Sequence, residues 1–165
     1  MDVETAKMEK LFNFTKKAFE AVMLEVVGEE IAPAEEFEIA PNDKLALSII
    51  IGISGETNGR ILLNTSVEDG NKIAVAMNFG DPLENEEDLH VYLAEFANMF
   101  CGRTATFINN EFGKRELWIS PPAIFSAKDL DVVTPNVVSM KAFYNCSIGK
   151  FVVDMGFSEN EYDEF

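Results

Sequence analysis

The chain has 165 residues, 47% of them hydrophobic, and a formal net charge of −16 at pH 7. This length and apolar content suit one folded domain with a core of its own. The charge argues against nucleic acid, anionic lipid and free phosphorylated metabolites as ligands, because binding them depends on Lys and Arg contacts with phosphate. No apolar run is long enough to span a membrane, no secretion signal is recognisable, and the two cysteines lack a disulfide-framework spacing. We therefore expect a cytoplasmic protein with reduced thiols.

The first half of the chain predicts a helix followed by strands. Residues 3–27 repeat apolar side chains with the helical period, which predicts an amphipathic helix. Residues 32–41, bracketed by prolines, predict a connector with a short edge strand. The apolar runs 44–54 and 59–66 flank Asn58-Gly59, a dipeptide typical of a tight hairpin turn.

Two further helices are expected next, each with a recognisable start. Ser66 and Asp69 resemble a capping box. Residues 84–112 form the longest helical pattern, with Asn85 as the N-cap and three acidic residues in its first turn. A strand over 117–126 follows, interrupted by Pro121-Pro122.

Two alternating runs around a turn at 147–149 predict a closing hairpin. The element order suggests an α-βββ unit used twice, with little residue identity between the halves. We therefore predict an α+β fold with a mostly antiparallel sheet and long helices. The expected domain spans 1–157, and residues 158–165 are expected to form an acidic, disordered tail.

The long helix over 84–112 carries the candidate site. On a helical wheel, at about 100° per residue, one stripe is apolar and is expected to face the core: Leu89, Leu93, Phe96, Phe100 and Phe107. Glu95, Asn98 and Gly102 lie on the opposite side, along one line. Asn and Gly are poor choices for a helix interior, at about 1–1.5 kcal/mol together relative to alanine, which favours a surface that another molecule contacts.

These residues resemble the signature of the CheC/CheX/FliY phosphatases of bacterial chemotaxis, Asp/Ser-x3-Glu-x2-Asn-x22-Pro. Glu95 and Asn98 match the central pair, and Pro121 stands at the required distance. Gly102 also matches the family's habit of a glycine four residues after the Asn. A second Glu-x-x-Asn pair, Glu68 and Asn71, has no proline at that distance. The leading Asp/Ser position is Val91.

The resemblance implies a function that is completed on another protein. Members of this family remove phosphate from the phosphoaspartate of a CheY-like response regulator. Asn98 would orient the attacking water, and Glu95 would pair with a lysine of the regulator. Gly102 would give clearance for the regulator's loops, and Pro121 would shape the neighbouring strand. The chain would need no cofactor or metal of its own, since the Mg²⁺ would sit on the regulator's receiver domain.

A single Glu-x-x-Asn helix is similar to CheX, whose members are typically homodimers joined through their sheets. Two alternatives remain open beside the phosphatase. Val91 favours a CheX-fold module that binds a receiver without efficient hydrolysis. A scaffold of a flagellar or signalling assembly is the other alternative. Among other residues, His90 is expected to be plain surface and Cys101 a small packed residue rather than a nucleophile.

Overall fold

A computed structural model describes residues 3–36, 45–55, 58–113, 117–127 and 137–158. The elements follow the predicted order of helices and hairpins. They are α1 (Val3–Val27), β1 (Leu47–Gly55), β2 (Gly59–Thr65), α2 (Val67–Met77), α3 (Glu86–Phe112), β3 (Leu117–Ile119), β4 (Ala123–Ser126), β5 (Val137–Cys146) and β6 (Gly149–Ser158).

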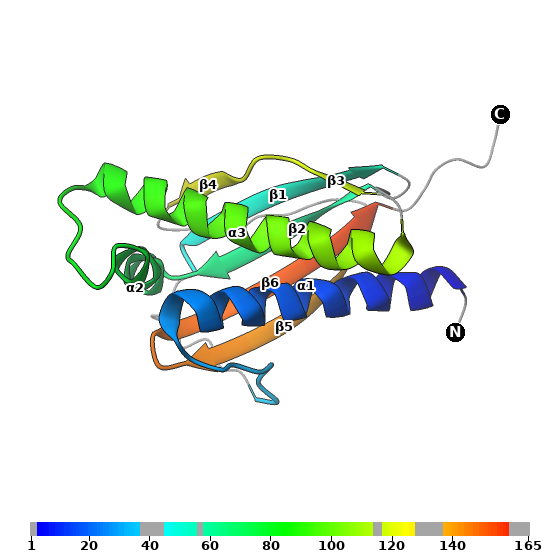
Figure 1. Cartoon of the computed structure of the whole chain (residues 1–165), viewed down its shortest axis with the longest axis horizontal. Helices are drawn as coiled ribbons and strands as arrows, with labels where there is room; N and C mark the ends of the chain where they lie inside the picture. The colour runs from blue at the N-terminus through cyan, green and yellow to red at the C-terminus, as the bar shows by residue number, and fades with distance from the viewer. Residues whose placement is uncertain (1–2, 37–44, 56–57, 114–116, 128–136, 159–165) are drawn as a thin grey trace.

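The strands form one antiparallel sheet in the order β3-β1-β2-β6-β5. β4 also pairs with β1, at residues 47–50, whereas β3 pairs with residues 53–55. Helices α1 and α3 lie side by side across one face of this sheet (Figure 1). This arrangement confirms the predicted α+β fold with a mostly antiparallel sheet. None of the helices in the described ranges is long and apolar enough to cross a lipid bilayer.

The topology supports the predicted internal duplication. Each half contributes a long helix and a hairpin, and the two hairpins meet where β2 pairs with β6. The strands that follow α3 pair with β1 of the first hairpin. In the other half, Ala34 N donates to Phe143 O of β5 at 2.6 Å, so the segment after α1 turns toward the second hairpin. Each half thus reaches across to the other.

Two predicted segments differ from expectation or go undescribed. Residues 32–36 of the expected edge strand are not in a strand, and 37–41 lie outside the described residues. β6 runs through Ser158, and the rest of the expected tail, 159–165, also lies outside them.

The core fills the space between the two long helices and the sheet. Alternate residues of the central strands face the helices, among them Ile49 and Ile51 of β1 and Val153 of β6. Phe19 of α1 stands at the centre, with its ring 5.6 Å from that of Phe100 and 5.0 Å from that of Tyr144. These contacts fix how α1 and α3 are rotated on the sheet, and so determine which face of α3 is left outside.

Candidate functional site

Helix α3 is a long, well-capped helix that begins at an Asn. The Asn85 side chain accepts a hydrogen bond from Asp88 N at 3.0 Å, and the Asp88 carboxylate accepts one from Glu84 N at 3.0 Å. These two bonds satisfy backbone donors at the start of the helix that have no partner inside it. At the other end Gly113 adopts a left-handed conformation, φ 66°, and ends the helix. The Asn85 cap confirms the prediction.

One face of α3 is packed against the core. Leu93, Phe96 and Phe100 are fully buried, as the helical period predicted, and Leu89 and Phe107 are partly buried against the same cluster. The helix therefore presents its other face on a rigid base.

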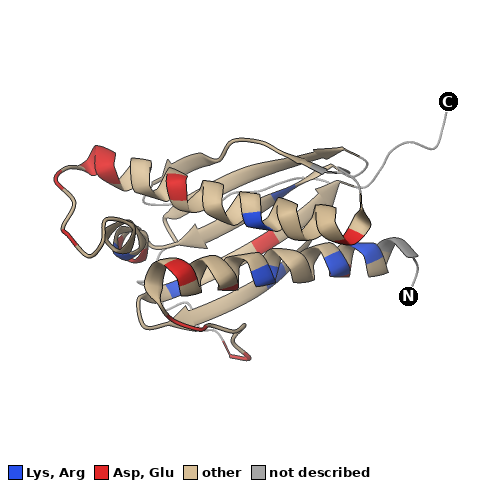
Figure 2. Cartoon of the chain, in the orientation of Figure 1, with Lys and Arg blue, Asp and Glu red and all other residues tan. Residues whose placement is uncertain are grey.

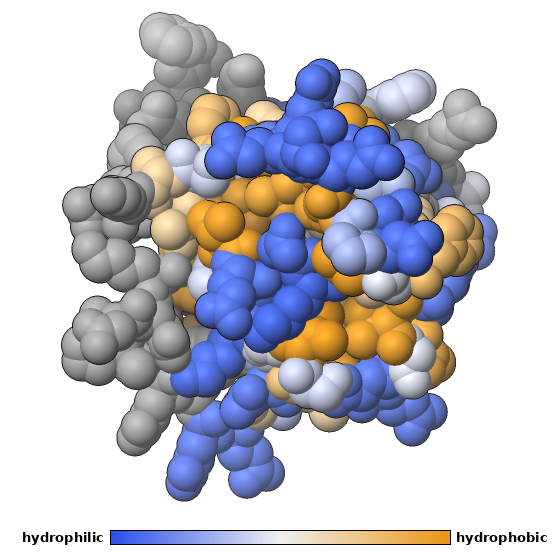
Figure 3. Space-filling view, turned by 90° about the vertical axis from the view of Figure 1, so that its left-hand side faces the viewer, coloured by the Kyte–Doolittle hydropathy of each residue, from blue (hydrophilic) through white to orange (hydrophobic). Residues whose placement is uncertain are grey.

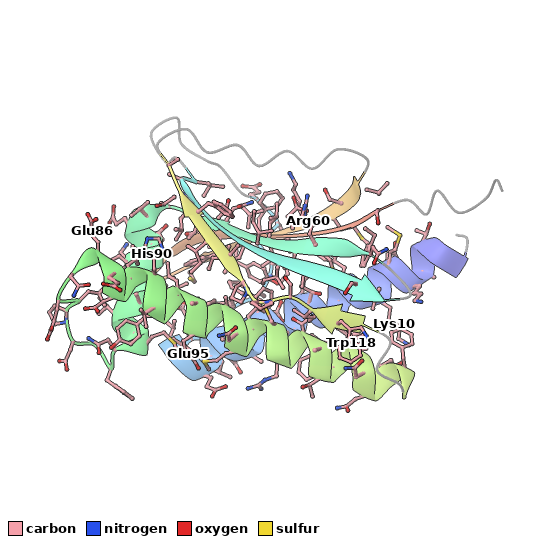
Figure 4. All side chains as sticks on the ribbon, turned by 90° about the horizontal axis from the view of Figure 1, so that it is seen from above. Lys10, Arg60, Glu86, His90, Glu95 and Trp118 are labelled. Atoms are coloured by element: carbon pink, nitrogen blue, oxygen red, sulfur yellow. The ribbon has the colours of Figure 1, made fainter. Side chains whose placement is uncertain are left out.

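Glu95, Asn98 and Gly102 are all exposed on that other face. Their spacing of three and four residues stacks them along one line, and Figure 4 shows Glu95 directed away from the sheet. Neither Glu95 nor Asn98 makes a hydrogen bond or ion pair with the described part of the chain. A carboxylate and a carboxamide are thus presented together to solvent with their bonding capacity unused.

Gly102 leaves an open place beside them. A β-carbon built at this glycine meets nothing within 4 Å, so packing within the described chain gives no reason for glycine here. Glycine in a helix interior is destabilising by roughly 0.5–1 kcal/mol relative to alanine. The exposed line therefore contains a position where the backbone is bare and another molecule can approach it closely.

The line is flanked by α1 on one side and by the β3–β4 connection on the other. Arg103 pairs with Glu25 of α1 at 2.7 Å. Pro121 is exposed between β3 and β4. Pro121 and Pro122 cannot donate to a sheet. Ser120 makes the bonds to β1 just before them: its N donates to Gly52 O at 2.9 Å and its Oγ accepts from Gly52 N at 2.8 Å.

The sequence also matches a family model. The model described as "Chemotaxis phosphatase CheX" matches residues 47–144, more than half of the chain. The chain belongs to the CheX family.

Solved structures of CheX proteins share this fold at low sequence identity. CheX from Desulfovibrio desulfuricans has a TM-score of 0.75 and 19% identity, over 90% of this chain and 99% of that one. CheX from Vibrio vulnificus gives 0.73 and 18%, over 90% and 96%. A complex of CheX with CheY, BeF3 and Mg²⁺ from Borrelia burgdorferi gives 0.70 and 18%, over 90% and 97%. No curated protein sequence matches the chain.

One position on the line does not match the CheC/CheX/FliY motif that the chain resembles. Val91, four residues before Glu95, is 59% exposed and brings neither a hydroxyl nor a carboxylate. The following residue, Tyr92, donates its phenol hydrogen to Asn78 Oδ1 at 2.6 Å. This bond ties the end of α2 to the site helix. The sequence did not predict this bond, because the two residues belong to different helices.

The remaining residues discussed in the sequence, Cys101, His90 and the pair Glu68 and Asn71, are not part of this exposed line. Cys101 is buried, and burial raises the pKa of its thiol to about 12, which disfavours the thiolate that a nucleophile needs. His90 is exposed. In the second Glu-x-x-Asn pair, on α2, Glu68 is engaged by Lys72 at 3.4 Å, whereas Glu95 is unengaged.

The described ranges contain no group of three or more His, Cys, Asp or Glu residues that could hold a metal ion. The candidate site therefore consists of a carboxylate, a carboxamide and a bare stretch of helix backbone. Such a site can dock on another molecule and orient its groups.

Proposed function

We propose that this CheX-family chain dephosphorylates the phosphoaspartate of a CheY-like response regulator. The observation that carries the proposal is the exposure of Glu95 and Asn98, both unengaged, beside the open position at Gly102. The Borrelia burgdorferi protein of similar fold, crystallised in complex with CheY, supports a receiver domain as the partner. The family description as a phosphatase supports the reaction.

In this proposal Asn98 enters the receiver's active site and holds a water molecule in line with the phosphorus–oxygen bond. A carboxamide suits that role, since it can donate and accept hydrogen bonds and stays neutral beside a phosphoryl group. Catalysis is then a matter of positioning, with no covalent intermediate on this chain. Glu95 pairs with a lysine of the receiver and fixes the register of the helix. The Mg²⁺ belongs to the receiver, and the chain acts as a homodimer joined through its sheets.

The test is the decay rate of phosphorylated receivers encoded in the same genome. The wild-type chain accelerates the decay of one of them, and Asn98→Ala removes at least about 100-fold of that acceleration, a loss typical of misplaced reacting groups. Glu95→Ala raises KM, because it removes a charge-assisted contact made on docking. Asn71→Ala is the matched control, since Asn71 is an exposed Asn in the Glu-x-x-Asn pair of α2. Unchanged decay of every receiver with the wild-type chain would rule the proposal out.

A second candidate function is favoured by Val91. In that case the chain binds a receiver without hydrolysing its phosphoaspartate, because the side chain at the motif's leading position is apolar. Tight binding of a phosphorylated receiver whose decay is not accelerated would support this function. Accelerated decay that disappears in Asn98→Ala, with binding retained, would support the phosphatase.

A further inference from the structure

The corner between α2 and α3 ends in a conformation that normally requires glycine. Gly80 N donates to Val75 O at 2.9 Å and Phe79 N to Ala76 O at 3.1 Å, the bond pattern of a Schellman motif. The left-handed residue of that motif is usually Gly, and here it is Phe79, with φ 57°. Gly80 stands one position later. A bulky residue with positive φ is a true outlier, and it destabilises the chain that contains it.

Phe79 is also almost completely exposed. Its side chain is 98% exposed, the highest value among the exposed large hydrophobic residues of the described chain. In a Schellman motif the next residue usually contacts the helix through an apolar side chain, and Gly80 has none. Neither the backbone conformation nor the packing of the free chain therefore favours a phenyl ring at this position. Two unfavourable features at one residue point to a contact made with another molecule.

The corner is bonded to the site helix through Asn78. Asn78 Nδ2 donates to Asp81 O at 3.1 Å, and its Oδ1 accepts from the Tyr92 phenol at 2.6 Å. Tyr92 directly follows Val91, which is exposed on the same line as Glu95 and Asn98. The corner lies at the end of the molecule where α3 begins (Figure 1), and the view onto that end has apolar surface open between polar side chains (Figure 3). The Asn78–Tyr92 bond thus links the corner that carries Phe79 to the turn of α3 that carries Val91.

The charge around Phe79 restricts what can cover it. Asp81, Glu84, Glu86 and Glu87 are all exposed in the connection to α3 and in its first turn. A second acidic surface would be repelled here. A partner protein that covers Phe79 should therefore present an apolar patch bordered by basic side chains. In the proposed function this patch lies next to the lysine that pairs with Glu95.

We propose that Phe79, together with Val91, is an apolar anchor for the same receiver domain that Asn98 acts on. This inference rests on the proposed function and adds a docking contact to it. Burial of a phenyl ring corresponds to roughly ten- to a hundred-fold in affinity. Because Phe79 brings an apolar ring and no group that could hold water or contact a phosphoryl group, it acts on binding and leaves the chemical step unchanged.

Two substitutions separate the contact from the backbone strain. Phe79→Gly removes both the ring and the left-handed penalty, so it raises Tm by about 2–4 °C while weakening binding about ten-fold or more. Phe79→Ala removes the ring and keeps the penalty, so it weakens binding equally without raising Tm. Phe125→Ala is the matched control: Phe125 is an exposed phenylalanine on β4, on the face of the sheet away from the helices, because its neighbour Ile124 packs on the core. Sedimentation first shows that this variant keeps the oligomeric state of the wild type.

The measurements are the Kd for the beryllofluoride-loaded, Mg²⁺-bound receiver and the kcat and KM for its phosphorylated form. We expect a raised Kd and KM and an unchanged kcat for both Phe79 variants, and no change for Phe125→Ala. If the wild-type chain accelerates decay and the Phe79 variants keep its KM, the docking role proposed for Phe79 is wrong, and the proposed phosphatase function is retained. If the wild type neither binds nor dephosphorylates any receiver, both are wrong. If sedimentation shows that the Phe79 variants lose self-association instead, the occupant is a second copy and the inference is overturned.

Discussion

Glycine at position 102 destabilises α3 in the free chain, and packing within the described residues gives no reason for it. A β-carbon there would meet open space, unlike Gly149, where a β-carbon would overlap the carboxylate of Asp69. The two glycines therefore have different explanations. Gly149 is required by the fold, whereas Gly102 is explained by an approaching partner.

Substituting Gly102 is expected to change stability and activity in opposite directions. Gly102→Ala raises the free energy of unfolding by roughly 0.5–1 kcal/mol, because alanine favours the helix, and urea denaturation measures this. Gly102→Leu keeps most of that gain but fills the clearance and lowers kcat/KM on the phosphorylated receiver by at least about ten-fold. Equal kcat/KM in wild type and Gly102→Leu would show that no partner approaches the backbone here.

At the scale of elements, the turn between β5 and β6 is fixed by carboxylates from two other segments. Asp69, in the first turn of α2, accepts from Lys150 N at 3.1 Å, and Glu29 accepts from Ser147 N at 3.2 Å. Asp69 also accepts from Lys72 at 3.2 Å. The turn thus docks against the start of α2 through backbone donors that would otherwise lack partners.

Gly149→Ala is expected to loosen that docking. Gly149 has φ +147°, a conformation that L residues rarely adopt, and the added methyl group would displace Asp69. We expect a loss of about 1–3 kcal/mol in the free energy of unfolding, measured by chemical denaturation. In the Asp69→Ala background the steric part of the loss should shrink, because the displaced carboxylate is gone. A Gly149→Ala chain as stable as wild type would contradict this account.

The elements that the sequence predicted best are those with local determinants. The caps at Ser66 and Asn85 are confirmed, with Asp69 N donating to Ser66 Oγ at 3.0 Å, because capping depends on residues three positions apart. The pairing of β3 and β4 with β1 was not predicted, since nothing local to residues 117–126 encodes a partner more than sixty residues away. The left-handed conformation of Phe79 was not predicted either, because sequence rules expect glycine at such a position and do not single out a phenylalanine.

The sequence predicts only part of the candidate site as well. The exposure of Glu95 and Asn98 follows from helical period alone, and the structure confirms it. Their roles do not follow, because those depend on groups that another protein supplies.

At the scale of the whole molecule, charge is distributed unevenly over the two long helices. Lysines and glutamates are mixed along α1, whereas acidic side chains alone gather where α3 begins (Figure 2). The two halves of the duplicated fold are thus chemically unequal, and α1 has no Glu-x-x-Asn pair to match that of α3. One half carries the candidate site, and the other serves as its support.

The fold also depends on neutral groups at its centre. Burial, reinforced by the neighbouring Glu20, raises the pKa of Tyr144 well above its usual range; its hydroxyl donates to Glu20 at 2.9 Å. Burial likewise raises the pKa of Cys101 to about 12. In the unfolded chain these groups ionise near pH 10 and pH 8.5, so between those values and the folded-state pKa the folded chain holds more protons.

The free energy of unfolding should therefore be insensitive to these groups below about pH 8 and fall as the pH rises above it. Each group lowers it by up to about 1.4 kcal/mol per pH unit above its unfolded pKa. Urea denaturation between pH 7.5 and 11 measures the slope. Tyr144→Phe should flatten the slope above pH 10, and Cys101→Ala the part that begins near pH 8.5. The growing negative charge of the whole chain adds a slope common to all three proteins, so identical slopes in wild type and both variants would contradict the prediction.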